Sequence, residues 1–508
     1  MEVDPRRWSV HPYSIGTLRS LLAEHSKHGW PEDSVHDRYF EDYFGTLGAK
    51  AVVVERDYVD HDFLEDFAAY YVRCFKDYAR KCTRLHFFRK AVGERDFARL
   101  LEERDAADAA KLGKAYLGFL VVRPVPQRCV GRTCLITYSE GSGREYTNLR
   151  PYEASLFGLR LEVTTLAFQQ QDRTVAECAT AALWSAFQAT GKLFGHRIPS
   201  PAEITQAATR RIPLETRTLP TSGGLSAEQM ADAVRACDLE PLHIGATDPD
   251  VLRATVYAYA GADVPVVLVG DVVDLAEPPN ATEPVAPPSH AVTVTGYNVA
   301  AASGTALDRL RSDRIDKLYV HDDAVGPFAR MMFENTVQST LTTSLAATKT
   351  EIGQRRFRPT MLLIPLYHKI RIPFGRVLGD VKTLIHFIGS LRASGAPGLD
   401  QDLAPCEWDV RLTTVNEYKR DVFEKRKVQK ARAVLERPMP RFIWVARATH
   451  PDQRGFDLLF DATGIEADDL CFARVDRGSP IPGVLREAGF QPDQFAGVEG
   501  PAAQLLGQ

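Results

Sequence analysis

The sequence predicts an α+β fold for the central part of the chain, where helix signals come first and strand signals follow. Apolar residues recur at helical spacing from Val175 to Thr190, and Ser200 and Ser226 each begin a capping box. Three strand-like runs come next: VPVVLVG (264–270), HAVTVTGYN (290–298) and KLYVHDD (317–323). Helices that precede a group of strands favour an antiparallel sheet with the helices packed against it.

The length of the chain predicts several domains, because 508 residues exceed an ordinary single domain. We expect an N-terminal α/β region at 1–150, the central α+β region at 151–340 and a C-terminal α/β region at 341–508. In the first region, the aromatic spacing after Asp60 predicts one long amphipathic helix that continues through Tyr78. In the last region, the tail from Gly478 is rich in Gly, Pro and Gln, which predicts a loose end. Strand-like runs in the two flanks are AVVVE (51–55), YLGFLVV (116–122), TMLLIPLY (360–367) and RFIWVARA (441–448).

The composition excludes several classes of protein. A formal net charge of -4 gives no overall attraction to nucleic acid or to an anionic membrane. No run approaches the roughly 18 apolar residues of a membrane span, and the opening MEVDPRRWSVHPYS lacks the apolar core of a signal peptide. The 8 cysteines are scattered, without the spacing of a disulfide framework or a zinc site. We therefore expect a cytoplasmic protein with reduced thiols and without a metal or an organic cofactor.

Cys178 stands where the first central helix is expected to begin, directly after a segment that contains three glutamines (FQQQDRTVAEC). A thiol in the first helical turn lies at the positive end of the helix dipole, which favours the nucleophilic thiolate. A side-chain amide beside it is a donor for an oxyanion. Cysteine is also among the most buried residue types, so a core position is the alternative for Cys178.

A base and an acid for such a thiol are available at the ends of two predicted strands. His290 begins the run HAVTVTGYN, and Asp322 and Asp323 end the run KLYVHDD. A carboxylate on a neighbouring strand end can orient an imidazole and fix its tautomer. Neighbouring strand residues point to opposite faces, so we expect Asp322 to face His290, and Asp323 and His321 to point away. Taken singly, the histidine could be structural and the Asp-Asp pair a turn signal.

The chain order Gln, Cys, His, Asp resembles that of the papain-like cysteine peptidases, and most closely the double-glycine leader peptidases that process bacteriocin precursors. The likeness rests on QDRTVAECATAAL, SHAVTVTGYN and YVHDDAVG and covers about residues 165–330. It implies a papain-like central domain, in which a Cys-bearing helix packs on an antiparallel sheet. It also implies a catalytic set of Cys178, His290 and Asp322, with the oxyanion held by Gln171.

The sequence departs from the pattern of that family at three places. Ala179 stands where the family has glycine, and Asp172 stands where it has the oxyanion glutamine, six residues before the cysteine. Gln171 and Gln170 lie seven and eight residues before the cysteine, so both are candidates for the oxyanion donor. The stretch between His290 and Asp322 is also longer than in the family.

These observations lead to a hypothesis of a cytoplasmic cysteine peptidase that cleaves a protein or peptide substrate. A thiol acyltransferase or deamidase would use the same residues, because all three activities share an acyl-enzyme. A non-enzymatic protein-binding module on a decayed peptidase fold is the remaining alternative. The proline-rich segment 275–289, which leads into His290, is expected to form an extended surface loop and a candidate lid.

Overall fold

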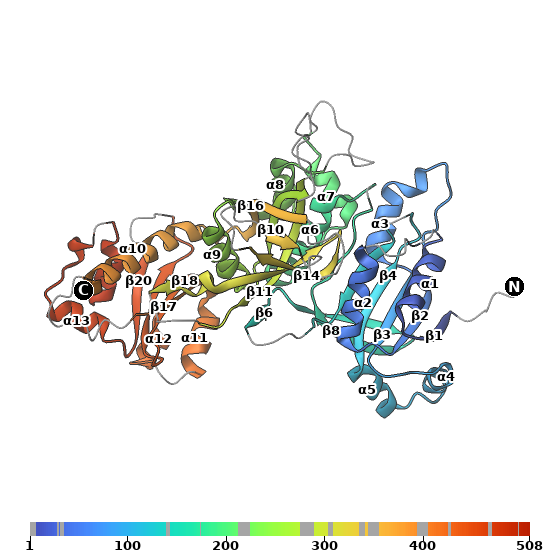
Figure 1. Ribbon diagram of the computed structural model, residues 1–508, viewed down its shortest axis with the longest axis horizontal. Helices are drawn as coiled ribbons and strands as arrows, with labels where there is room; N and C mark the ends of the chain where they lie inside the picture. The colour runs from blue at the N-terminus through green and yellow to red at the C-terminus, as the bar shows by residue number, and fades with distance from the viewer. Residues whose placement is uncertain are drawn as a thin grey trace. The chain divides into compact units, whose positions relative to one another are not determined.

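The computed structural model describes residues 7–27, 30, 35–126, 128–138, 143–172, 174–211, 224–274, 289–302, 308–334, 341–343, 355–393, 405–424, 428–465, 470–495 and 497–507 (Figure 1). The chain divides into two compact units. Unit 1 comprises Met1–Thr247, Asp263–Gly296 and Lys317–Pro365, and unit 2 comprises Asp248–Ala262, Tyr297–Asp316 and Leu366–Gln508. Both units combine helices with mainly antiparallel sheets, so the predicted α+β class is confirmed. Within the described ranges, no helix is both long and apolar enough to cross a membrane.

The N-terminal part of unit 1 is an antiparallel sheet with helices on both faces. Its strands, in spatial order, are β1 (Trp8–Pro12), β2 (Ala51–Tyr58), β3 (Cys82–Phe88), β4 (Tyr116–Val122) and β5 (Val130–Leu135). Its helices are α1 (Ile15–Ser26), α2 (Val35–Leu47), α3 (His61–Ala69), α4 (Glu94–Glu103) and α5 (Ala106–Lys114). Alternate residues of β2 serve different cores. Val54 packs in one cluster with Phe44 of α2, whereas Val53 packs in another with Phe97 of α4.

The single long helix predicted after Asp60 is wrong. Helix α3 ends at Ala69, a short 3-10 turn follows at Tyr71–Arg73, and the chain then runs to β3 without a helix. Tyr71 is buried, its hydroxyl donates a hydrogen bond to Asp172 at 2.8 Å, and the Tyr78 ring packs against the Tyr71 ring. The aromatic spacing therefore reflects a helix and a loop that fill the same core.

The central part of unit 1 places its helices before its strands, as predicted. Helices α6 (Cys178–Phe194), α7 (Pro201–Ala208) and α8 (Ala227–Arg235) come first. The expected capping boxes at Ser200 and Ser226 are both present. The strands that follow are β9 (Leu239–Gly245), β10 (Val266–Asp274), β11 (Ser289–Val299), β13 (Ile315–Asp322), β14 (Gly326–Phe333), β15 (Leu341–Thr343) and β16 (Arg355–Tyr367).

This second sheet closes on itself. Its strand order is β10-β11-β13-β14-β15-β16-β9, and β16 also pairs with β10. Helix α6 packs on the sheet, where the hydroxyl of Thr293 on β11 donates to the carbonyl of Ala182 at 2.6 Å. The hairpin of β7 (Arg150–Leu156) and β8 (Leu159–Thr165) precedes the glutamine segment. The predicted His290 and Asp322 lie on β11 and β13 of this sheet. Helix α6, which begins with Cys178, packs on the same sheet.

Unit 2 is built around a sheet of β12 (Arg309–Leu310), β17 (Glu407–Thr414), β18 (Phe442–Thr449), β19 (Gly455–Asp461) and β20 (Cys471–Arg477). Helices α9 (Pro249–Ala260), α10 (Phe374–Ala393), α11 (Val415–Glu424) and α12 (Ala431–Glu436) also belong to it. The prediction of a loose tail from Gly478 is wrong. The tail forms α13 (Ile481–Glu487) and α14 (Glu499–Leu506), because Ile481, Leu485 and Leu505 are fully buried.

Candidate active site

Cys178 is the first residue of α6, a helix whose next twelve residues, 179–190, are all buried. Cys178 is partly exposed, like Cys74, whereas the other cysteines are buried. The N-cap residue Glu177 has an extended backbone and makes no side-chain capping bond. The backbone N–H groups of the first turn are therefore uncapped by that side chain, and their partial positive charge surrounds the sulfur.

The loop before Cys178 folds around the carboxylate of Asp172. One oxygen of Asp172 accepts the backbone N–H groups of residues 174–176 at 2.9 to 3.0 Å, and the other accepts the hydroxyl of Tyr71 at 2.8 Å. A short acidic side chain is suited to this kind of local backbone bonding. Asp172 therefore anchors the loop here, at the position where the resembled family has its oxyanion glutamine.

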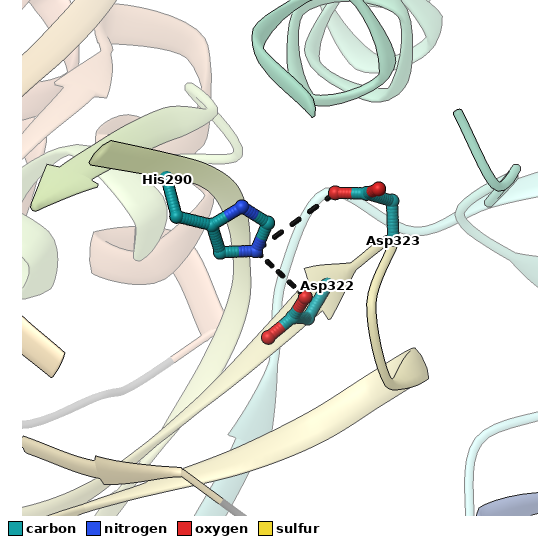
Figure 2. Close-up of side chains that lie close together, drawn as sticks. All are labelled: His290, Asp322 and Asp323. Carbon is teal, nitrogen blue, oxygen red and sulfur yellow. Dashed lines mark hydrogen bonds and ion pairs between the residues drawn. The ribbon is translucent and has the colours of Figure 1, made fainter. Parts of the chain in front are cut away.

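His290 is the second residue of β11, and its ring contacts a carboxylate on one side and the thiol on the other. Its Nε2 lies 2.8 Å from Oδ1 of Asp322, as Figure 2 shows. The side chain of Cys178 lies near enough to the imidazole to help raise the pKa of His290. Because Nε2 faces the carboxylates, Nδ1 is the nitrogen left for the sulfur. The structure thus brings Cys178, His290 and Asp322 together in that order.

Asp323 also lies beside His290, which the alternation argument did not predict. Its Oδ1 is 3.8 Å from Nε2 of His290 (Figure 2). Its Oδ2 is 3.8 Å from a guanidinium nitrogen of Arg128. The regular alternation ends here, because the β13–β14 register shifts between Val320 and Asp322 and the chain then turns. The expectation that Asp323 points away from the imidazole is therefore wrong, although Asp322 is the nearer acid.

His321 bonds with both ring nitrogens to groups other than His290 and the two acids. Its Nε2 donates to the carbonyl of Leu166 at 3.1 Å, and its Nδ1 accepts the backbone N–H of Phe328 at 3.1 Å. Burial lowers the pKa of His321 to about 3, so the ring is neutral. Both nitrogens are used in holding the sheet to its neighbours, which gives this histidine a structural role.

The charges in the group favour an imidazolium between carboxylates. Burial by itself lowers the pKa of His290, but the charge and hydrogen bond of Asp322, together with the contact to Cys178, raise it well above its usual value. Burial acts to raise the pKa of Asp322, yet the His290 ring outweighs it and the pKa is lowered. For Asp323, burial prevails and raises the pKa to about 6. The nearer acid is thus the ionised partner of the imidazolium.

The two glutamines proposed as oxyanion donors differ in their surroundings. Gln170 is buried, and its amide nitrogen donates to Nε2 of His36 at 2.7 Å. Gln171 is partly exposed. Gln169 is buried in a small cavity under α6 that Asp323 also lines, and its amide nitrogen has no hydrogen-bond partner among the described residues. Gln171 is the candidate whose side chain solvent can reach.

The same group contains a set of metal-ligand atoms. A ligand atom from each of His290, Asp322 and Asp323 lies within 4.8 Å of the other two. The contact between His290 and Asp322 is at hydrogen-bond length, so the closest pair already satisfies itself without an ion.

Sequence reasoning missed the contributions of the N-terminal part of unit 1. His36 on α2 reaches Gln170, and Arg128 lies beside Asp323. No spacing pattern links these residues to the Cys, His and Asp motifs, so only the folded chain shows the connection. The proposed lid at 275–289 lies outside the described residues except for Ser289, and it stays a prediction.

The protein-family models contain no match to this chain, and the search of curated proteins finds no similar sequence.

Proposed function

We propose that the protein is a cysteine peptidase of the papain-like type, which cleaves a protein or peptide through Cys178, His290 and Asp322. The observation that carries the proposal is the series of contacts from the partly exposed thiol to the imidazole and on to a buried carboxylate. A nucleophile, a base and a group that orients the base are the parts that acyl transfer to a thiol requires.

In the proposed mechanism, Cys178 gives its proton to His290, and Asp322 stabilises the imidazolium that results. The thiolate attacks the substrate carbonyl, and the backbone N–H of Cys178 and the amide of Gln171 hold the oxyanion. Gln170 is the second candidate for that amide, although its nitrogen already donates to His36. His290 protonates the leaving amine, and it then activates the water that releases the acyl group.

The position of the thiol supports an enzyme over a decayed binding module. A core cysteine would be buried, whereas Cys178 is the partly exposed end of a buried helix. Acyl transfer or deamidation by the same residues would differ only in the acceptor of the acyl group or in the leaving group. All eight cysteines are free thiols, which fits the cytoplasmic location that forms part of the proposal.

The proposal is tested with an acyloxymethyl ketone probe, which alkylates activated thiols, followed by mass spectrometry of the labelled peptides. We expect Cys178 to label at least about 10-fold faster than Cys74, its matched control as the other partly exposed cysteine. His290→Ala should remove this difference. Equal labelling of both thiols in the wild-type protein would contradict an enzymatic role. Denatured substrate proteins are then incubated either with the wild-type protein or with the Cys178→Ala variant. Fragments that form only with the wild-type protein indicate a peptidase, and modified but uncleaved substrates indicate a transferase or deamidase.

A further inference from the structure

We propose that His36, from the N-terminal part of unit 1, is a positioning residue that joins the glutamine segment 169–171 to the turn that carries both acids. The inference rests on the proposed function, because it assigns His36 a part in the same reaction. His36 contacts neither the thiol nor His290 in the described hydrogen bonds, so its effect passes through the backbone and Gln170.

Each of the two hydrogen bonds of His36 has a defined donor and a defined acceptor. The amide nitrogen of Gln170 can only donate, so Nε2 of His36 accepts from it at 2.7 Å. The carbonyl of Val325 can only accept, so Nδ1 of His36 donates to it at 3.0 Å. One neutral tautomer satisfies both bonds, and a protonated ring would break the first. Burial, supported by the charge of Arg128, lowers the pKa of His36 to about 4, which keeps the ring neutral.

The same bond series continues beyond the glutamine. The side-chain oxygen of Gln170 accepts the backbone N–H of Val130 at 3.4 Å, and its backbone carbonyl accepts a guanidinium N–H of Arg123 at 2.8 Å. Gln170 is thus fixed on both sides, directly next to the proposed oxyanion donor Gln171. Val325 lies three residues after Asp322, in the turn whose geometry sets the position of that acid.

Other side chains of the N-terminal part hold the backbone of the acid turn as well. The hydroxyl of Tyr39, one helical turn after His36, donates to the carbonyl of Pro327 at 2.6 Å. The hydroxyl of Tyr138 donates to the carbonyl of Phe328 at 2.7 Å. Gly326 has a φ of 154°, and a Cβ at that position would overlap the Tyr39 ring. The turn is therefore built against α2, and His36 is the member of this contact that also reaches the glutamine segment.

Two conservative variants separate the two links. The side-chain nitrogen of His36→Asn can replace Nδ1 toward Val325, and the side-chain oxygen of His36→Gln can replace Nε2 toward Gln170. His36→Ala removes both links. The matched control is His25→Ala, which changes a half-buried histidine of the neighbouring helix α1. Each variant is compared with wild type for the probe labelling rate of Cys178, for kcat and KM on a cleaved peptide, and for thermal unfolding.

We expect His36→Ala to lower the labelling rate and kcat by about 10-fold or more per folded molecule, with KM nearly unchanged, because misplaced groups slow the chemical step. Either conservative variant should restore part of the rate, whereas His25→Ala should affect unfolding alone. A His36→Ala protein as active per folded molecule as His25→Ala would overturn the inference. If wild-type Cys178 reacts no faster than Cys74, the proposed function fails and this inference falls with it.

Discussion

Among the described residues, a thiol lies near an imidazole in each unit, and the two pairs differ in almost every other respect. In unit 1, Cys178 is partly exposed at the start of a helix and contacts His290, whose other nitrogen faces a carboxylate. In unit 2, Cys406 lies 3.4 Å from Nδ1 of His450 and is fully buried. The sequence contained no pattern that paired these two residues.

The second contact has a local origin and the environment of a core residue. Cys406 precedes β17 and His450 follows β18, and the pairing of these strands places the two residues side by side. The other nitrogen of His450 lies 2.8 Å from the hydroxyl of Ser479. Burial and the charge of Asp308 raise the pKa of the Cys406 thiol to about 12. A reactive thiol needs access to solvent and a pKa that permits the thiolate as well as a nearby imidazole, and the buried Cys406, with its raised pKa, lacks the first two.

The largest expected difference between the two pairs is in activity. Cys178→Ala and His290→Ala should each lower kcat/KM on a cleaved peptide by about 1,000-fold or more, because each removes a reacting group. Cys406→Ala and His450→Ala should leave kcat/KM per folded molecule within about 3-fold of wild type. Steady-state kinetics of the four variants, each compared with wild type, measure these changes in kcat/KM. A large loss in either unit 2 variant would show that the second pair takes part in the reaction.

The next largest effect should come from replacing an acid beside the His290 ring, the imidazole of the first pair. Asp322→Asn should lower kcat by about 100-fold, because the imidazolium loses its ionised partner. It should also move the basic limb of the pH–rate profile to lower pH. The reason is that this carboxylate holds the pKa of His290 well above its usual value, and activity is lost as the pH rises through that pKa. Asp323→Asn, whose parent carboxylate is 3.8 Å away, should move the limb less. An unmoved limb in Asp322→Asn would assign the orienting role elsewhere.

Asp323 should show itself mainly in the pH dependence of stability. Its pKa in the folded protein is raised to about 6 from 3.8, so the folded state binds the proton more tightly than the unfolded chain. This group therefore destabilises the fold above pH 6, and the loss is relieved as the pH falls toward 4. Between these two pH values, the contribution of Asp323 to the free energy of unfolding changes by about 2–3 kcal/mol. Asp323→Asn should raise the free energy of unfolding at pH 7.5 and flatten its change between pH 4 and 7, as measured by urea unfolding. An unchanged slope would mean that Asp323 does not titrate in this range.

The smallest effect should separate the two cysteines by stability. Cys406→Ala removes a fully buried side chain and should cost about 1 kcal/mol in the free energy of unfolding. Cys178→Ala removes a partly exposed side chain at a helix end and should cost less than about 0.5 kcal/mol. Urea unfolding at one pH compares them. Equal costs would contradict the assignment of Cys406 to the core.

Local signals explain what the sequence could predict. The capping boxes at Ser200 and Ser226 are set by residues a few positions apart, and both are present. The approach of His290 to Asp322 was also predictable, because each residue stands at the end of a strand.

Tertiary contacts explain what the sequence could not predict. Tyr71 continues an aromatic pattern, but its hydroxyl binds Asp172, about a hundred residues away, and the helix stops before it. The tail from Gly478 is rich in Gly, Pro and Gln, yet Ile481 and Leu505 are both fully buried. His36 has no local feature at all, because its partners lie at Gln170 and Val325.

The alternation of the chain between the two units has a consequence for the order in which the protein is made. Residues 297–316, which belong to unit 2, are synthesised after the strand start that carries His290 and before the strand end that carries Asp322. A nascent chain that has already released Cys178 from the ribosome still lacks both partners of that thiol. The second sheet closes only when β16 follows, at residues 355–367. Because folding during synthesis proceeds as segments emerge, the thiol would gain its imidazole and acid late, after most of the polypeptide has left the ribosome.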